Sequence, residues 1–411
     1  MADNIYIATQ AILDRKEKIT AYELLFRSPT SEKQAQVLDD VQATSRVLVN
    51  TLNSIGIETL LGNKTGFINL NEVMLHDEVM ELLPADKFML EILEFTQVDD
   101  KLIERVIELK QQNFKFAIDD LVFDEQQLKH FSKLFPLVDL LKIEVLDMDE
   151  NNLRQMVERF KPSGVKLLAE KVENREMFNF CLELGFDYFQ GYYFSKPVIV
   201  KKKSLEPGQL VVSKLISQIS TEQSPEVIEK TFKEAPALIA SLLRYINSAS
   251  MGFRIEVGSI KHAINLIGCK KLMQWVILLS YASGDKNPSD DPLLQLVQRR
   301  AKTMEILANQ LAGNKLADEA FTVGLLSLMD ALYGMPIDEV LGSMKIGEQI
   351  SQAILHKQGK LGHILKILLS LDEEQFLQAH TLLGEIGLDA NALNHALLES
   401  IKWADEVSKS M

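Results

Sequence analysis

The chain has 411 residues, of which 46% are hydrophobic and 25% are charged, and its formal net charge is −14 at pH 7. This length predicts two domains, and this composition is typical of a globular protein with a full hydrophobic core. The excess of negative charge argues against broad binding to a nucleic-acid backbone, so we expect no DNA partner.

Features that would direct the chain to a membrane are not evident. We find no apolar run of the roughly 18 residues that a membrane helix needs. The start, MADNIYIATQAILDRKEK, lacks the basic and then apolar stretches of a secretion signal. Cys181 and Cys269 lie too far apart in sequence to suggest a disulfide framework or a metal-binding pair. We therefore expect a cytoplasmic protein with no membrane partner.

The first half of the chain alternates short apolar runs with amphipathic segments. Residues 5–27 are expected to form two strands joined by the polar turn DRKEK. The apolar runs that follow are separated by segments with helical spacing, such as DKLIERVIELKQQN (100–113). This alternation predicts a parallel sheet closed into a βα barrel, with a hairpin at its entrance. The further strands are expected in residues 66–70, 87–93, 114–120, 140–145, 165–172 and 186–191.

The second half has a different pattern. From about Val211 onward, long helix-like segments dominate, for example residues 292–313 and 345–358, and they are broken by Gly, Asn, Pro and Asp. We place the domain boundary near Ser204. The sequence therefore predicts an α/β barrel in residues 1–203 and an all-α domain in residues 204–411.

From the second expected strand onward, a polar residue recurs near the end of successive strands. In a parallel barrel these ends meet at one mouth, where such barrels hold their chemistry. Carboxylate and amide oxygens suit Mg²⁺ or Mn²⁺ better than Zn²⁺ or copper, and two adjacent aspartates could serve a pair of ions. Taken singly, each acid is better explained as a strand end or a helix N-cap, so the interpretation depends on the recurrence. The residues are Glu23, Asn69, Glu91, Asp119, Asp120, Lys142, Glu170 and Gln190.

The motifs around these residues resemble those of the EAL domain, a family that linearises cyclic di-GMP to pGpG with Mg²⁺ or Mn²⁺. The signature tripeptide of the family reads ELL here, in AYELLFR (21–27), and the paired aspartates close FAIDD (116–120). In their order, the motifs cover most of residues 1–200. The others are FINLN (67–71), EILE (91–94), LLKIEV (140–145), AEKVE (169–173) and QGYYFSKP (190–197).

The resemblance implies a TIM-like barrel whose first strand is antiparallel, and it implies a role for each matching residue. The residues that would hold two metal ions are Glu23, Asn69, Glu91, Asp119 and Asp120. Those implied in catalysis are Glu23, Glu170 and Lys142, the last of which would hold and activate the attacking water. Those implied in substrate binding are Gln10, Arg27 and Gln190, whereas Glu94 would steady the loop after the paired aspartates.

The sequence departs from the family around these residues. The paired aspartates continue as LVFD (121–124) where the family usually has FGTG, and the loss of both glycines removes backbone freedom. Leu24 replaces the Ala of the signature, and Lys171 replaces the Gly of AEGVE. The family's RQPI reads TQAI here, so Gln10 is kept. The metal ligands are thus intact, while their surroundings differ.

The second half resembles an HDOD domain, a helical signalling module related to HD phosphohydrolases that usually lacks their metal site. The resemblance depends on APALIASLLRYINSASMG (235–252) and SIKHAINLIG (259–268), and continues more loosely through FTVGLLSLMDALYG (321–334). In the last of these, Asp330 stands as a lone acid where an active HD enzyme would have a His-Asp pair. We therefore expect no phosphohydrolase activity from this domain.

Two hypotheses stay open at this point. In the first, the chain is a bacterial cyclic di-GMP phosphodiesterase that is slow or regulated. In the second, it is a catalytically inactive sensor or scaffold, in which the altered loop prevents turnover and the HDOD half acts through an unknown signalling protein. A homodimer is compatible with either, and the resemblance implies control of motility or biofilm formation.

Overall fold

The computed structural model of the chain divides into two compact units, Met1–Phe194 and Ser195–Met411. The boundary that we predict at Ser204 lies outside the described residues. The structure describes residues 6–27, 57, 61–70, 72–76, 80, 83–191, 207–247, 257, 259–281, 288–344, 346–373 and 375–410.

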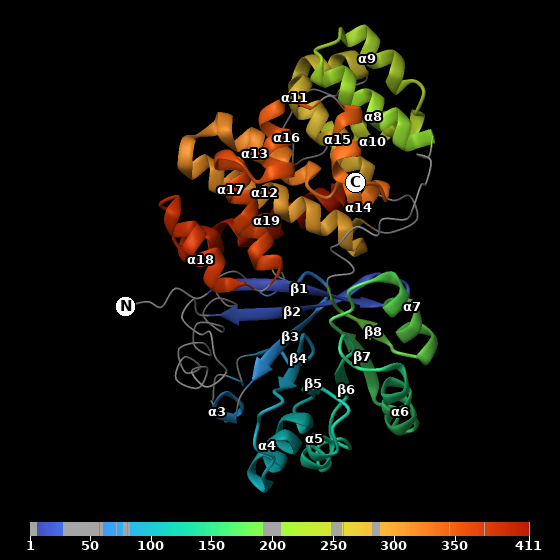
Figure 1. The fold of residues 1–411 in the computed structure, drawn as a ribbon, viewed down its shortest axis with the longest axis vertical. Coiled ribbons are helices and arrows are strands. Elements are labelled where there is room, and N and C mark those ends of the chain that lie inside the picture. The colour runs from blue at the N-terminus through green and yellow to red at the C-terminus, as the bar shows by residue number, and fades with distance from the viewer. Residues whose placement is uncertain are drawn as a thin grey trace. The chain divides into compact units, whose positions relative to one another are not determined.

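The first unit is built on a closed barrel in which each strand pairs with the next and β8 returns to β1 (Figure 1). β1 runs antiparallel to both β2 and β8, and the other neighbouring strands are parallel to one another. The expected barrel with an antiparallel first strand is therefore confirmed. The strands are β1 (Tyr6–Asp14), β2 (Ile19–Arg27), β3 (Thr65–Leu70), β4 (Phe88–Ile92), β5 (Lys115–Leu121), β6 (Leu140–Glu144), β7 (Lys166–Glu170) and β8 (Tyr188–Phe189).

Helices connect the parallel strands and cover the outside of the barrel. A short polar side chain caps several of their first turns: the Asp99 carboxylate accepts from Leu102 N at 2.8 Å, and Asn174 accepts from Met177 N at 2.8 Å. Such caps satisfy backbone donors that a helix leaves free, so they fix where each helix begins. The helices are α3 (Glu72–Leu75), α4 (Asp100–Gln111), α5 (Glu125–His130), α6 (Glu150–Phe160), the 3-10 turn η3 (Lys161–Ser163) and α7 (Arg175–Leu184).

A layer of apolar side chains fills the inside of the barrel. Each strand contributes one of them, so the barrel is a packed core and not a pore. The members are Ile12, Ala21, Phe67, Met89, Ala117, Leu140, Leu168 and Tyr188. We call this set the barrel floor.

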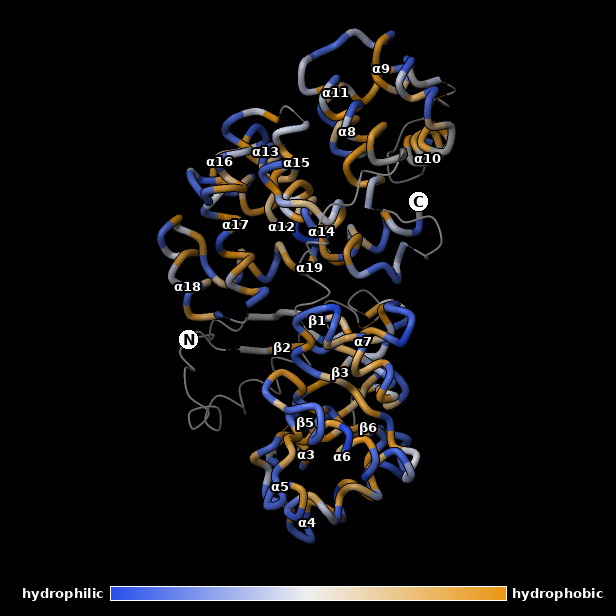
Figure 2. Tube along the Cα trace, turned by 45° about the vertical axis from the view of Figure 1, so that its right-hand side comes forward, coloured by the Kyte–Doolittle hydropathy of each residue, from blue (hydrophilic) through white to orange (hydrophobic). Residues whose placement is uncertain are grey.

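The described part of the second unit is helical, as expected from its sequence. Its helices carry hydrophobic residues beside hydrophilic ones along the chain, as amphipathic helices do (Figure 2). The elements are α8 (Pro207–Ser220), α9 (Pro225–Phe232), α10 (Pro236–Ile246), α11 (Ile260–Tyr281), η6 (Pro288–Asp290), α12 (Pro292–Ala312), α13 (Asn314–Leu326), α14 (Met329–Tyr333), α15 (Ile337–Met344), α16 (Glu348–His356), α17 (Gly359–Asp372), α18 (Phe376–Glu385) and α19 (Ala390–Ser410).

Among the described helices, α11 has a segment, Lys261–Tyr281, that is long and apolar enough by length and composition to cross a membrane, contrary to the expectation from the sequence. Gly268 interrupts this helix with φ 77° and ψ 160°, values outside the helical region. The helical stretch from Gly268 to Tyr281 is shorter than the roughly 20 residues that a membrane-spanning helix needs. The composition of α11 therefore reflects a core helix in two pieces, and Val276, Ile277 and Leu272 in it are buried.

Candidate active site

Eight of the predicted site residues form one layer directly above the barrel floor. Along each strand, the polar residue stands two positions from the floor residue, and alternate residues of a strand face the same side of the sheet. Ala21 is followed by Glu23, for example, and Leu140 by Lys142. In the antiparallel β1 the direction is reversed, so Gln10 precedes Ile12. The eight residues of this layer are Gln10, Glu23, Asn69, Glu91, Asp119, Lys142, Glu170 and Gln190.

Lys142 is the centre of this layer, and its side chain is 1% exposed. Its Nζ forms four ion pairs with carboxylates from other strands. An ammonium group has three N–H donors, so it cannot satisfy four carboxylates at once. The Nζ distances are 2.6 Å to Asp119 Oδ1, 2.8 Å to Glu91 Oε1, 2.9 Å to Glu170 Oε1 and 3.2 Å to Glu23 Oε2.

Glu23 joins the two sides of the layer. Its Oε1 accepts a hydrogen bond from the Asn69 amide at 2.9 Å, and its Oε2 accepts from Gln190 Nε2 at 2.6 Å. The same Gln190 amide donates to Gln10 Oε1, across the point where β8 closes on β1. Gly191 permits the position of Gln190, because a Cβ there would lie 2.3 Å from the backbone nitrogen of Val172.

Burial and charge shift the pKa values of this layer in opposite directions. Burial raises the pKa of Asp119 to about 6 and the pKa values of Glu91 and Glu170 well above their usual range. Burial would also raise the pKa of Glu23, but the charge of Lys142 and several hydrogen bonds outweigh it and lower that pKa. For Lys142, burial works against the charged form, yet the surrounding carboxylates outweigh it and raise the pKa well above the usual value.

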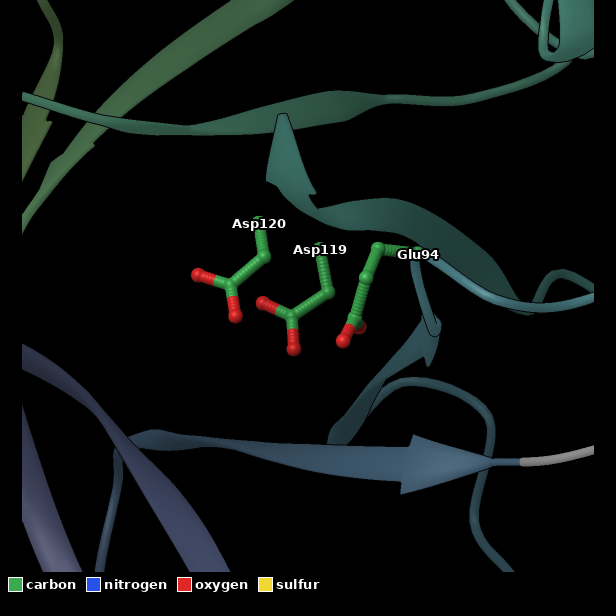
Figure 3. Close-up of side chains that lie close together, drawn as sticks. All are labelled: Glu94, Asp119 and Asp120. Carbon is green, nitrogen blue, oxygen red and sulfur yellow. The ribbon is translucent and has the colours of Figure 1, made fainter. Parts of the chain in front are cut away.

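Asp119 and Asp120 both face the site although they are adjacent in sequence. Simple alternation would direct one of them away, but the register between β5 and β6 shifts between Ile118 and Leu121. Asp120 also has a φ of 46°, in the left-handed region. Together with Glu94, the two aspartates offer carboxylate oxygens that lie within 4.8 Å of one another. Figure 3 shows these three carboxylates directed toward the same space.

The chemistry of the layer fits a divalent cation. Among the described residues, the buried oxygens Asn69 Oδ1, Glu91 Oε2 and Glu170 Oε2 accept no hydrogen bond. Buried oxygens without a partner are costly, and one lysine does not balance the carboxylates around it. Carboxylate and amide oxygens are the ligands that Mg²⁺ and Mn²⁺ prefer. The residues present therefore suit hard divalent ions, with Glu94, Asp119 and Asp120 as a set close enough to share one ion.

The altered loop LVFD is ordered by side-chain hydrogen bonds. Gln127 Oε1 accepts from Val122 N at 2.9 Å, and Gln127 Nε2 donates to Asp120 O at 3.2 Å. The Asp124 carboxylate accepts from Gln127 N at 2.8 Å and caps α5. Leu121 is fully buried at the end of β5. In this chain, side chains thus hold the segment where the family usually has glycines.

Two residues near the layer, Glu144 and Lys171, were not predicted as site residues from the sequence. Lys171 Nζ lies 2.7 Å from Glu144 Oε2 and 3.6 Å from Asp120 Oδ1. Glu144 stands two positions beyond Lys142 on β6, so the alternation of the strand could have indicated that both side chains face the site. No pattern in the sequence indicates where the Lys171 side chain lies, because its position depends on the turn after β7, in which Lys171 has a φ of 57°.

For Arg27 the structure describes the backbone, at the end of β2 where it pairs with Tyr6. Its expected contact with a substrate phosphate stays a prediction. The roles that the resemblance implies for the other site residues likewise stay predictions, although the structure brings these residues together.

Comparisons with protein families and with known proteins agree with this architecture. Residues 2–197 match the EAL domain family, and residues 209–334 match the HDOD domain family. The helices after residue 334 lie beyond the HDOD match.

Two proteins resemble the chain over nearly its whole length. Cyclic di-GMP phosphodiesterase CdgJ of Vibrio cholerae is 28% identical over 98% of this chain and 93% of its own. Protein YuxH of Bacillus subtilis is 28% identical over 97% of this chain and 98% of its own. Among solved structures, an EAL domain protein from Listeria monocytogenes is 23% identical over 47% of this chain and 88% of that chain, with a TM-score of 0.38.

Proposed function

Because the chain consists of an EAL domain followed by an HDOD domain, we propose that its barrel hydrolyses cyclic di-GMP to the linear dinucleotide pGpG. The observation that carries the proposal is the layer of polar side chains above the barrel floor, with more carboxylates than Lys142 can balance. The likeness to a cyclic di-GMP phosphodiesterase of Vibrio cholerae supports the choice of substrate.

The proposal assigns metal binding to the oxygen ligands of the layer. Glu23, Asn69, Glu91, Asp119 and Asp120 would hold Mg²⁺ or Mn²⁺, and Glu94 lies close enough to the two aspartates to take part. When bound, divalent ions supply positive charge that polarises a phosphodiester and makes a nearby water more acidic. Hydrogen bonds to the side chains of Gln127 and Asp124 hold the loop after the paired aspartates in this chain.

The remaining side chains of the layer would position the reactants. Where divalent ions take over some of the carboxylates that Lys142 contacts in this structure, the Lys142 ammonium would have an N–H donor with which to orient a water molecule toward the phosphorus. Glu170, whose Oε2 accepts no hydrogen bond from the described residues, can accept a proton from that water. Gln10, Gln190 and Arg27 would bind and orient the dinucleotide.

A turnover assay tests the proposal. The full-length protein is incubated with cyclic di-GMP and Mg²⁺ or Mn²⁺, pGpG is followed by chromatography, and cyclic di-GMP binding is measured separately in Ca²⁺. We expect pGpG from the parent and at least a hundredfold less from Glu23→Ala, as for the loss of a group that holds the reacting centre. Binding without product would instead identify a sensor. The absence of both binding and product would refute a nucleotide function of the barrel.

The HDOD half is proposed to pass the state of the barrel to a partner protein in a pathway that controls motility or biofilm formation. The pattern that carries the HDOD resemblance has a structural role in this chain. Asn247, from LLRYINS, donates to Val257 O at 3.0 Å and accepts from Val257 N at 2.8 Å, so it ties two segments of the domain together.

A further inference from the structure

Lys171 places a positive charge beside the paired aspartates. It follows β7 directly, and its Nζ lies between the ends of the two preceding strands, 2.7 Å from Glu144 Oε2 on β6 and 3.6 Å from Asp120 Oδ1 on β5. The Lys171 side chain is 47% exposed, whereas that of Asp120 is 35% exposed. The ammonium therefore stands at the rim of the site, on the side of Asp120.

The backbone of Lys171 is in a conformation that favours glycine. Its φ of 57° lies in the left-handed region, where a Cβ approaches the following carbonyl oxygen and glycine is favoured. Asp120, its ionic partner, also has a positive φ, of 46°. Two left-handed residues, one on β5 and one directly after β7, are thus joined by one ion pair across the end of β6, and the side chain of Lys171 contributes an interaction that a glycine could not.

We infer that Lys171 is a resident cation that competes with a divalent metal ion for Asp120 and thereby raises the metal concentration at which the site fills. The inference rests on the proposed metal site and concerns how that site is regulated. A metal ion that binds at Asp120 must either approach the Lys171 ammonium or displace it toward Glu144.

Both routes weaken metal binding. Like charges a few ångströms apart repel, and displacement of the ammonium breaks the contact with Asp120. Because Lys171 is about half exposed, solvent and salt screen the effect, so we expect a change of about tenfold in affinity and not several orders of magnitude. The effect acts only at the Asp120 side, since Lys142 and not Lys171 contacts the buried carboxylates.

Titration of the full-length protein with Mn²⁺, followed by the electron paramagnetic resonance signal of free Mn²⁺, measures this affinity without substrate. Lys171→Met removes the charge and keeps a side chain in the left-handed turn, Lys171→Gly removes both the charge and the strain, and Lys171→Arg keeps the charge. Lys166→Met is the matched control, because Lys166 begins the same strand and its ammonium pairs with Asp187 at 2.8 Å with 56% exposure.

We expect Lys171→Met and Lys171→Gly to bind Mn²⁺ about tenfold more tightly than the parent, while Lys171→Arg and Lys166→Met bind as the parent does. The difference should narrow in 0.5 M KCl, as screening of an exposed charge requires. Equal affinities in the parent and both uncharged variants would overturn the inference while leaving the proposed metal site intact. Tighter binding in Lys171→Gly alone would assign the effect to backbone strain and also overturn it. Absence of Mn²⁺ binding in the parent and all variants would refute the metal site itself.

Discussion

The side-chain amide of Gln127 donates a hydrogen bond to the backbone carbonyl of Asp120 at 3.2 Å, while its oxygen accepts from the backbone nitrogen of Val122 at 2.9 Å. Gln127 therefore holds the backbone on both sides of Leu121, directly after the irregular part of β5 in which Asp120 takes a left-handed conformation. Through it, the first turn of α5 fixes the direction in which Asp120 faces.

Gln127→Ala removes both hydrogen bonds, each of which contributes about 1 kcal/mol to the local structure. We expect the variant to bind Mn²⁺ several-fold more weakly, because Asp120 loses its orientation while its carboxylate is kept. The unfolding temperature should fall by only a few degrees. The matched control is Gln126→Ala on the exposed side of the same helix, and equal Mn²⁺ affinity in the two variants would argue against a positioning role for Gln127.

Lys142→Met replaces the buried ammonium with an apolar side chain of similar length. Removing one partner of a buried ion pair leaves uncompensated charge and typically costs about 3–5 kcal/mol. We expect the variant to have a markedly lower unfolding temperature in EDTA, with part of the loss recovered in Mn²⁺, and to produce no measurable pGpG. Thermal unfolding with and without Mn²⁺ measures the first two outcomes.

Lys133→Met is the control for that experiment, because Lys133 pairs with Asp100 at the surface, where its side chain is 63% exposed. Its unfolding temperature should equal that of the parent in both buffers. An unchanged unfolding temperature for Lys142→Met in EDTA would mean that Lys142 does not balance the carboxylates around it.

Mn²⁺ affinity should fall as the pH is lowered through 6. Burial raises the pKa of Asp119 to about 6 in the metal-free protein, so below this pH a proton competes with the metal for the carboxylate. Competition by a single proton weakens binding by about tenfold per pH unit. Mn²⁺ titrations between pH 5 and 8 measure the slope, and a constant affinity over this range would contradict the protonation of Asp119.

The same pKa shift has a consequence for stability that Asp119→Asn tests in EDTA. A carboxyl whose pKa is raised on folding stabilises the folded state only where it is protonated, and this contribution is lost as the pH rises through about 6. The asparagine side chain that replaces Asp119 is uncharged at every pH. We therefore expect its unfolding temperature, relative to that of the parent, to increase between pH 5 and pH 7.5.

In the second unit, Arg300 offers a separate test. Its side chain is 4% exposed, and its guanidinium lies 2.7 Å from Asp372 Oδ2 and 2.9 Å from Ser327 Oγ. Asp372→Asn leaves this buried cation without its carboxylate, so chemical denaturation should show a loss of about 1.5–3 kcal/mol. Glu226→Gln breaks the exposed pair with Lys261 and should cost almost nothing, so equal losses in the two variants would contradict the buried ion pair.

Much of the fold and of the candidate site could be predicted from the sequence because both depend on local pattern. Strands alternate two faces, so the polar residue two positions beyond each apolar floor residue faces the same side, as Ala21 and Glu23 illustrate. The predicted strands all occur, with differences at their ends: β5 continues to Leu121, whereas the strand expected in residues 186–191 is limited to Tyr188–Phe189. The sequence also contains the donor types that suit Mg²⁺ or Mn²⁺.

The tertiary structure alone decided how these residues meet. Closure of the barrel brings Gln10 to Gln190 and surrounds Lys142 with carboxylates from four other strands, since pairing between distant strands is not encoded in any one of them. The bulge and left-handed turn that direct Asp120 into the site depend on the register between β5 and β6. The charge of Lys171 reaches Asp120 because the pairing of β5 and β7 with opposite edges of β6 brings the turn after β7 within reach of the end of β5.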